Sequence, residues 1–123
     1  MSVSYFVLYR GEAGDLAAFI QRYRKDHVPI LLRWPGVRRV ALHTPAGASD
    51  PKSTNFAGLA MMAEIVFDDE AALAAALNSD ERAEARQDFA RFPPFHGDVL
   101  HQALQTESFA PGMPIDGQTG DRP

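Results

Sequence analysis

Residues 59–79, LAMMAEIVFDDEAALAAALNS, decide the fold because they join the most apolar stretch of the chain to a strong helix former. The first part, residues 59–67, is almost continuously apolar, which predicts a central β-strand. Asp68 and Asp69 can cap a helix, and the alanine-rich stretch behind them has high helix propensity. A strand followed directly by a helix is the unit around which the rest of the chain must be arranged.

The N-terminal part predicts a second unit of the same kind. Residues 3–9 are rich in Val, Tyr and Phe and predict a strand, and Asp15 can cap the helix that follows. One face of that helix carries residues at steps of three and four: Leu16, Phe19, Ile20, Tyr23 and His27. Pro29 should bend or end the helix, and residues 37–44 should form another strand after the Pro35-Gly36 turn.

The remaining segments complete the pattern. The loop 45–58 is dense in turn-forming residues, residues 80–91 predict a further helix, and residues 98–108 predict a last strand. The order β-α-β-β-α-β, with a split second helical region, predicts a ferredoxin-like α+β fold. In it a four-stranded antiparallel sheet carries both helical regions on one face.

The other face of that sheet has no helix to cover it, and neither face is convincingly polar, as Phe6 and Ile65 indicate. We therefore expect a homodimer in which two sheets close into a dimeric α+β barrel. The expected domain covers residues 1–109. Residues 110–123 are rich in proline and glycine, which predicts an arm or a disordered tail.

Composition excludes several classes of function. A chain of 123 residues with 46% hydrophobic and 23% charged residues has the size and composition of one globular domain. The absence of cysteine excludes disulfides, thiolate catalysis and cysteine-ligated metal clusters. A net charge of −4 gives no basic field to attract nucleic acid, and we expect no such partner. With no apolar run of membrane-spanning length and no basic leader, we expect a cytoplasmic protein that does not associate with membranes.

Several short motifs, in a consistent order and spacing, resemble the EthD family. They indicate a helix ending in His-x-Pro, a Pro-Gly turn into the second strand, a capped alanine-rich helix and a late aromatic helix. The motifs are Asp26-His27-Val28-Pro29, Trp34-Pro35-Gly36-Val37-Arg38-Arg39, Phe67-Asp68-Asp69 with Ala71, and Asp88-Phe89 with Phe92. The resemblance covers residues 3–109.

The resemblance implies a ferredoxin-like subunit that dimerises into an α+β barrel, with a pocket between helices and sheet in each subunit. Members of the family are associated with ether degradation, muconolactone isomerisation and the tailoring of polyketide or aromatic intermediates. They generally act without metal or organic cofactor. The resemblance therefore implies no cofactor and a small hydrophobic or aromatic molecule as ligand.

His27 is the best candidate for a catalytic residue, because it continues the apolar face of its helix and should point at the sheet. Imidazole titrates near neutrality, which suits proton transfer at a carbon beside a carbonyl. Asp26 could pair with His27 only if Pro29 perturbs this turn, because adjacent residues on a helix point about 100° apart. Alternatively, His27 hydrogen-bonds a backbone carbonyl and stabilises the kink.

Six further residues are candidates for substrate binding: Tyr9, Trp34, Arg39, His43, Phe89 and Phe92. A tyrosine in a pocket can donate a hydrogen bond to a developing oxyanion, and the other aromatic residues could line an apolar cavity. Arg39 and His43 share one face of their strand, and Arg39 could bind a carboxylate or enolate if that face lines the pocket. Otherwise both face the dimer partner or solvent, and the aromatic residues pack the core and the helix ends.

Other polar residues support no site by their pattern. The chain has no His-x-x-x-His or Glu-x-x-His spacing, and His96 and His101 fall on opposite faces of a shared strand, so we expect no metal site. The charged run 80–86 has the spacing of a solvated helix face.

Two functions fit these features. The first is a cofactor-free enzyme that acts by proton transfer on a small hydrophobic carbonyl compound, a lactone or an aromatic or polyketide intermediate, as an isomerase, cyclase or oxygenase. The second is a non-catalytic barrel that binds a hydrophobic metabolite or serves as an accessory protein in a degradation pathway. The sequence alone does not decide between them.

Overall fold

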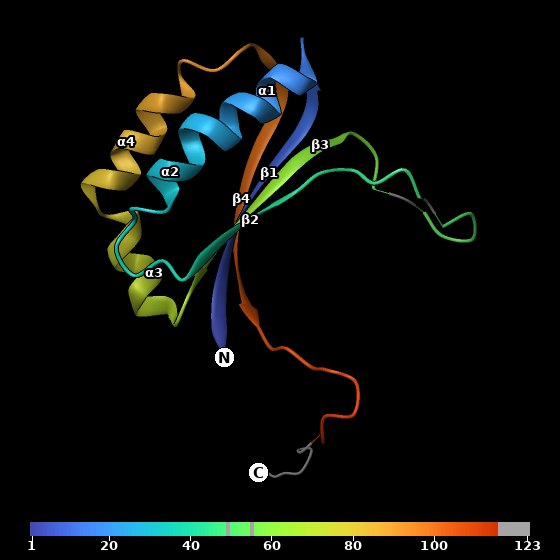
Figure 1. Cartoon of the computed structure of the whole chain (residues 1–123), viewed down its shortest axis with the longest axis vertical. Helices are drawn as coiled ribbons and strands as arrows, with labels where there is room; N and C mark the ends of the chain where they lie inside the picture. Colours follow the sequence, from blue (N-terminus) through green and yellow to red (C-terminus); the bar gives the residue numbers. More distant parts are fainter. Residues whose placement is uncertain (49, 55, 116–123) are drawn as a thin grey trace.

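The computed structural model describes residues 1–48, 50–54 and 56–115 (Figure 1). In chain order its elements are β1 (Ser2–Ala13), α1 (Leu16–Arg22), the π-helical turn η1 (Tyr23–His27), α2 (Val28–Leu31), β2 (Arg39–His43), β3 (Leu59–Phe67), α3 (Glu70–Leu77), α4 (Asp80–Phe89) and β4 (Phe95–Thr106). The strands form one sheet in the order β2-β3-β1-β4, and each neighbouring pair is antiparallel. This confirms the predicted ferredoxin-like α+β fold.

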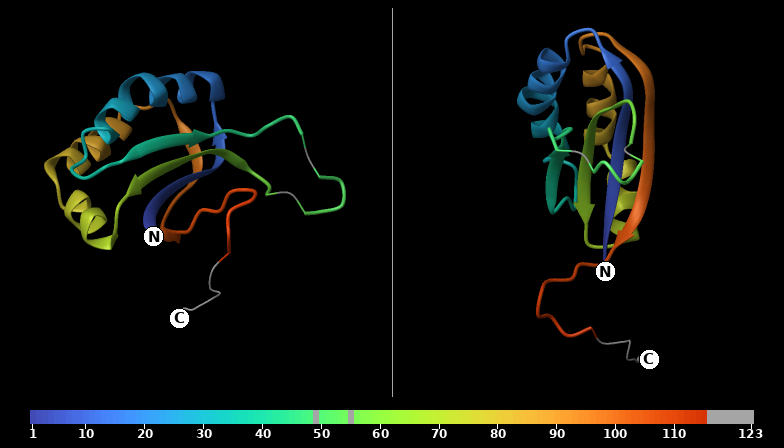
Figure 2. Two further views of the ribbon diagram at one scale, coloured as in Figure 1. Left: turned by 60° about the horizontal axis from the view of Figure 1, so that its bottom comes forward. Right: turned by 90° about the vertical axis from the view of Figure 1, so that its right-hand side faces the viewer.

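The helices cover only one face of the sheet (Figure 2). On that face Tyr5 of β1 lies opposite Ile65 of β3, and Tyr9 lies opposite Met61. All four side chains are buried and belong to the hydrophobic core that the sheet shares with the helices. The core exists because alternate residues of β1 and β3 are apolar on the same side.

The second face of the sheet, which carries no helix, is partly apolar. Leu8 of β1 lies between Met62 of β3 and Leu100 of β4. Leu100 and Leu104 are 40% and 49% exposed in the single chain. An apolar patch of this kind on a sheet face is typical of a surface that another molecule covers.

The β1–β4 ladder is longer at one end than predicted, because two glycines face each other in it. Gly11 lies opposite Gly97, and the pairing continues to Ala13 and Phe95. Their φ angles are +145° and +155°, and a Cβ built on Gly11 would lie 2.2 Å from the carbonyl oxygen of His96. Only glycine allows backbones this close, and beyond them the partly buried Phe95 packs against the core.

The first helical region begins where the sequence predicts but does not end where the sequence predicts. The Asp15 side chain accepts a hydrogen bond from the Ala18 amide at 3.0 Å, as an N-cap should. Pro29 does not end the helix, because it falls in the first turn of α2, directly behind the π-helical turn. Instead, the hydrogen-bonding pattern changes just before it, in η1.

The π-helical turn keeps one helix face aligned over a long distance. Residues four apart on a regular α-helix drift by about 40° per step, because four residues exceed one turn of 3.6. Yet Phe19, Tyr23, His27 and Leu31 are all buried on the sheet side. The wider turn of η1 offsets that drift and lets His27 point at the sheet.

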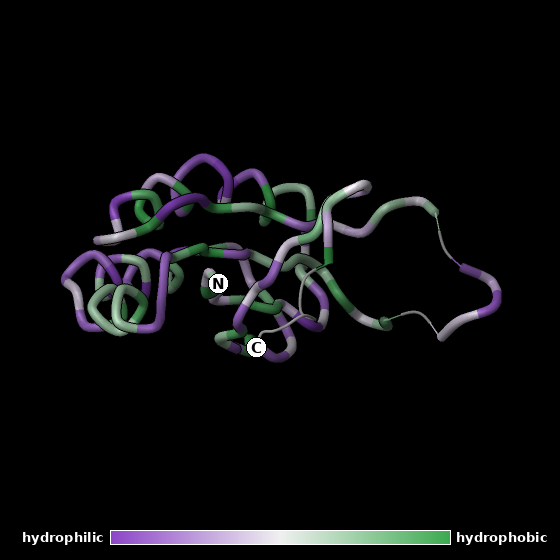
Figure 3. The backbone as a smooth tube through the Cα atoms, turned by 90° about the horizontal axis from the view of Figure 1, so that it is seen from below, coloured by the Kyte–Doolittle hydropathy of each residue, from purple (hydrophilic) through white to green (hydrophobic). Residues whose placement is uncertain are grey.

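The remaining described segments lie outside this core. The described residues between β2 and β3 project away from the sheet (Figure 3), and residues 107–115 lead away from the end of β4 without helix or strand. Most of the predicted tail, from residue 116 on, lies outside the described residues. In the part of the chain that the structure describes, no helix is long and apolar enough to cross a membrane.

Candidate functional site

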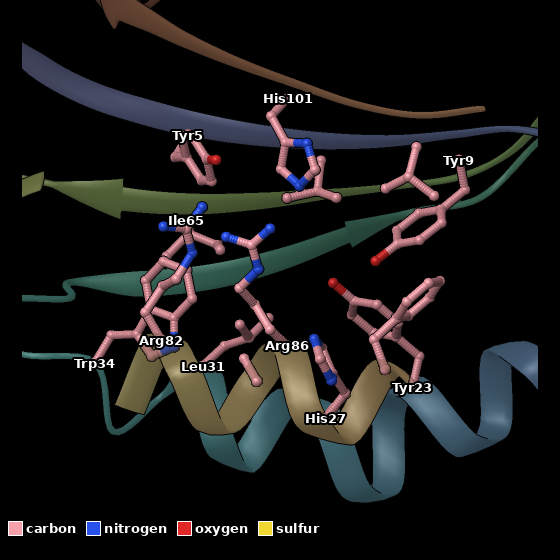
Figure 4. Close-up of a pocket in the computed structure, with 14 residues that line it drawn as sticks. Tyr5, Tyr9, Tyr23, His27, Leu31, Trp34, Ile65, Arg82, Arg86 and His101 are labelled. Atoms are coloured by element: carbon pink, nitrogen blue, oxygen red, sulfur yellow. The ribbon is translucent and has the colours of Figure 1, made fainter. Parts of the chain in front are cut away.

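A cavity of about 520 Å³ lies between the sheet and the helices η1, α2 and α4 (Figure 4). A volume of this size is typical of small-molecule sites. Its walls are mainly aromatic and aliphatic, with two histidines and two arginines among them: Tyr5, Val7, Tyr9, Tyr23, His27, Leu31, Trp34, Ile65, Arg82, Ala85, Arg86, Phe89, Val99 and His101. No aspartate or glutamate is among these lining residues.

His27 is buried in the cavity wall and paired with a carboxylate. Its Nδ1 lies 2.9 Å from Oδ2 of Asp88, which is also buried. An ionised carboxylate only accepts hydrogen bonds, so Nδ1–H donates and Nε2 of the neutral ring keeps its lone pair. Figure 4 shows that other nitrogen turned toward the cavity. The partner thus fixes the tautomer of the ring and leaves an unprotonated nitrogen that can accept a proton.

Burial lowers the pKa of His27 below its ordinary value of 6.5, and this outweighs the hydrogen bond and charge of Asp88, which raise it. The neutral, basic form of the ring is therefore the one present at pH 7. Phe92 packs its ring edge-on against His27, with centroids 5.3 Å apart, and helps to exclude water from it.

The partner of His27 is Asp88 and not Asp26. Asp26 follows the helix away from the cavity, is 44% exposed, and pairs with Arg22 at 2.6 Å. Arg22 also donates to Oδ1 of Asp88 at 2.9 Å, so the carboxylate that faces His27 is held from both sides. The expected pairing of His27 with Asp26 is therefore wrong, because neighbouring helix positions diverge.

Two tyrosines lie next to His27. The Tyr9 and Tyr23 rings pack edge to face with centroids 5.6 Å apart, and Figure 4 shows their hydroxyls turned toward each other. The Tyr23 ring also lies tilted beside that of His27, with centroids 4.6 Å apart. Burial raises the pKa of Tyr9 to about 12 and the pKa of Tyr23 well above its ordinary value, so both stay protonated at neutral pH. A hydrogen bond between the two hydroxyls could use only one of their two protons, so one O–H is left to donate to an oxygen in the cavity.

The other predicted aromatic residues are placed in different ways. Trp34 and Phe89 line the cavity, whereas Phe92 lies behind His27 and is not among the lining residues. Trp34 Nε1 is the buried side-chain donor that has no hydrogen-bond partner among the described residues. Such a donor is costly unless paired, so an acceptor at this wall would be stabilising.

Arg39 and His43 do not line the cavity, which corrects the expectation that they bind its ligand. Strand alternation puts them on the sheet face without helices, with Val40 and Leu42 on the other. There His43 Nε2 lies 3.1 Å from Glu64 Oε1, and Arg39 lies 3.9 Å from Oε2 of the same carboxylate. Burial raises the pKa of Glu64, but hydrogen bonds from His43 and Ser4 and the charge of Arg39 outweigh it and leave that pKa lowered.

Sequence reasoning missed several residues of the site. Asp88 lies in a motif of the family resemblance, and Tyr23 lies on the same helix face as His27, so both had a signal. Arg82 and Arg86 were predicted to be solvated; Arg86 is exposed and Arg82 is partly buried, and both also line the cavity. The described residues contain no cluster of three or more histidines or carboxylates placed to bind a metal.

Comparison with known proteins places the chain in context. The sequence model of the EthD domain matches residues 12–93, and no curated protein gives a significant match. Solved structures that are similar include an ethyl tert-butyl ether D (EthD) family protein from Bacillus halodurans C-125, with a TM-score of 0.70 and 23% identity over 87% of this chain and 100% of that one.

Two further structures share the fold at lower identity. SnoaB, a cofactor-independent oxygenase from Streptomyces nogalater, has a TM-score of 0.59 and 15% identity over 89% of this chain and 97% of its own. A dimeric protein with a ferredoxin-like fold from Bacteroides fragilis NCTC 9343 has a TM-score of 0.56 and 10% identity over 85% of this chain and 96% of its own. At these identities the likeness concerns the fold.

Proposed function

The chain belongs to the EthD family, and on that premise we propose that it is a cofactor-free enzyme that transfers a proton on a small hydrophobic carbonyl compound. Lactones and aromatic or polyketide intermediates are the compounds that suit its cavity. The observation that carries the proposal is the buried His27–Asp88 pair, whose free Nε2 faces an aromatic cavity of about 520 Å³. A base in a cleft, whose pKa is shifted by burial and by a charged partner, is typical of a catalytic site.

The proposed reaction begins when His27 Nε2 removes a proton from a carbon beside the substrate carbonyl. The electron pair of that C–H bond moves to the carbonyl oxygen and gives an enolate. Asp88 stabilises the imidazolium through the Nδ1–H hydrogen bond, and the free O–H of the Tyr9–Tyr23 pair donates to the enolate oxygen. Return of the same proton to another carbon gives an isomer, so atoms and charge balance.

The same deprotonation can serve a different outcome. SnoaB is described as a cofactor-independent oxygenase, and a carbanion formed at a phenolic or enolic substrate is the species that can react with molecular oxygen. Isomerisation and oxygenation therefore share the step that His27 would carry out. They differ in whether oxygen is consumed.

A two-step experiment tests the proposal. A thermal-shift screen of lactones, quinones and polyphenols first identifies compounds that stabilise the protein. Those compounds are then incubated with the protein in deuterated water, and NMR follows loss of the proton signal beside the carbonyl while an electrode follows oxygen. We expect deuterium incorporation. Stabilisation with neither exchange nor oxygen uptake would contradict the enzyme and leave the non-catalytic binding protein.

The pH dependence of the rate tests the His27–Asp88 pair. The base form of a histidine is present above its pKa, and burial lowers that of His27. The rate should therefore hold at neutral pH and fall only below the ordinary histidine value of 6.5. In Asp88→Asn the rate should drop at least tenfold. The acid limb, which is the low-pH side of the pH–rate profile where the rate falls, should also move to lower pH, because the carboxylate that raises the His27 pKa is gone.

Asp26→Asn is the matched control, because it removes the other carboxylate that contacts Arg22 without touching His27. It should leave both the rate and the acid limb in place. If Asp88 were purely structural, Asp88→Asn would lower the rate without shifting the acid limb. Equal pH–rate profiles for Asp88→Asn and Asp26→Asn would contradict a functional His27–Asp88 pair.

We also propose that the chain forms a homodimer through the sheet face that carries no helices. The half-exposed Leu100 and Leu104 on that face support it, and the similar protein from Bacteroides fragilis is described as dimeric. Sedimentation velocity at micromolar concentration should give about twice the chain mass. A single species at 13.5 kDa would contradict the proposal.

A further inference from the structure

Helix α4 turns one face to the cavity, and that face is basic. Arg82, Ala85, Arg86 and Phe89 all line the cavity. They lie at positions i, i+3, i+4 and i+7, which share one side of a helix. Figure 4 shows the Arg86 guanidinium reaching from α4 across the cavity toward His101 on β4.

Two acidic residues of the same helix, Glu84 and Asp88, have partners elsewhere. Glu84 forms two hydrogen bonds with Arg33, both at 2.9 Å, on the outside of the helix. Asp88 is used by Arg22 and His27. In the charged run 80–86, the helix therefore places Arg82 and Arg86 at the cavity and Glu84 on the outside.

The two arginines have no acidic partner in the part of the chain that the structure describes. Arg82 donates to the backbone oxygen of Leu77 at 3.2 Å, and Arg86 is exposed and makes no ion pair among the described residues. Like charges at i and i+4 repel each other. The two arginines lie beside a cavity whose lining residues include no aspartate or glutamate. They therefore create a local region of positive potential, although the chain as a whole has a net charge of −4.

We propose that this part of the cavity is a binding site for the carboxylate of an aromatic or lactone acid, held by Arg82 and Arg86. The inference takes the cavity of the proposed enzyme as its site and adds the class of substrate. A planar guanidinium matches a carboxylate through two parallel hydrogen bonds, which gives orientation as well as affinity. With the carboxylate at the arginines, the rest of the ring system lies between the aromatic walls and extends toward His27.

His101 supports this assignment from the sheet side. It lies across the cavity from the arginines, with its ring 5.8 Å from that of Tyr5. Burial lowers the pKa of His101, and the charges of Arg82 and Arg86 lower it further. A neutral imidazole at this point can hydrogen-bond the ligand without adding a third cation.

Two isosteric probes test the inference by isothermal titration calorimetry: 2-naphthoate, which carries the carboxylate, and 2-naphthamide, which does not. We expect the wild-type protein to bind 2-naphthoate at least about tenfold more tightly, because charge-assisted hydrogen bonds form only with the acid. Arg82→Gln and Arg86→Gln should each reduce that preference, and the double variant should abolish it. Equal affinities in the wild type, or no binding of either probe, would overturn the inference.

The controls separate charge, folding and catalysis. Arg24→Gln removes the same charge from a surface position where Arg24 contacts Gln21, and it should leave the preference intact. The double variant Arg82→Lys with Arg86→Lys keeps both charges but not the planar fork, so it should retain a reduced preference for the acid. It also guards against a glutamine variant that fails to fold. Loss of preference in Arg24→Gln equal to that in Arg86→Gln would overturn a specific site.

Failure of this inference and failure of the proposed function are distinguishable. His27→Gln should keep the preference for 2-naphthoate, because it leaves both arginines in place. A protein that prefers the acid but catalyses no proton exchange would retain the binding site and lose the enzyme. A protein that exchanges protons but does not discriminate between the probes would retain the enzyme and lose the carboxylate site.

Discussion

Replacing His27 with glutamine should lower kcat for proton exchange by roughly 10²–10⁴-fold, the range by which a positioned general base accelerates proton transfer. Glutamine is close to histidine in size and can still donate a hydrogen bond to Asp88, so the buried carboxylate keeps a partner. It has no group that accepts a proton near neutral pH. The NMR exchange assay on the wild-type and variant proteins measures the difference, and the acid limb of the pH profile should disappear with the histidine.

The matched control is His96→Gln, because His96 is exposed on β4 and is not among the cavity residues. It should exchange protons at the wild-type rate. If His27→Gln also retained that rate while remaining folded, His27 would be a structural residue that orders the helix, and the proposed base would have to be abandoned.

Phe19→Ala should lower the free energy of unfolding by about 3–5 kcal/mol, the usual range for truncating a buried phenylalanine. Phe19 is fully buried, and its ring lies 5.4 Å from the rings of Tyr9, Phe92 and Phe95. Its removal leaves a void between α1 and the sheet that these aromatic rings cannot fill without leaving their own contacts. Urea denaturation followed by circular dichroism measures the loss.

Leu16→Ala tests the same helix at its rim. Leu16 begins α1 and is 40% exposed, so its truncation should cost less than about 1 kcal/mol. Equal losses in the two variants would mean that the aromatic cluster is not the element that fixes α1 on the sheet. Because small domains are stable by only about 5–15 kcal/mol, the Phe19 variant should also melt at a clearly lower temperature.

Much of the fold could be predicted because it depends on local signals. The alternation in β1 placed Tyr5 and Tyr9 on one face, and Asp15 and Asp69 could be recognised as caps from their position before a helical pattern. The burial of His27 followed from the same periodicity. These features need only the order of residues in one element and the repeat of that element.

The composition of the site depends on which helices and strands pack against each other. The periodicity within one element gives no information about this packing. Asp88 reaches His27 from a helix 61 positions away in the chain. The direction of Arg82 and Arg86 depends on how α4 is rotated about its axis, and the alternating charges around them suggest a solvated face equally well. Arg39 and His43 were placed incorrectly because nothing within β2 indicates which of its faces the helices cover.

The π-helical turn has a consequence for how related chains are aligned. η1 spans Tyr23–His27 with one residue more per hydrogen-bonded turn than an α-helix would hold. A homologue whose helix is regular at this point would be one residue shorter between the same two packed positions. If such a homologue were aligned without a gap, the residue next to its histidine would stand opposite His27. A histidine that both chains have would then look like a substitution. The gap belongs within residues 23–27, and only the geometry of the turn shows where.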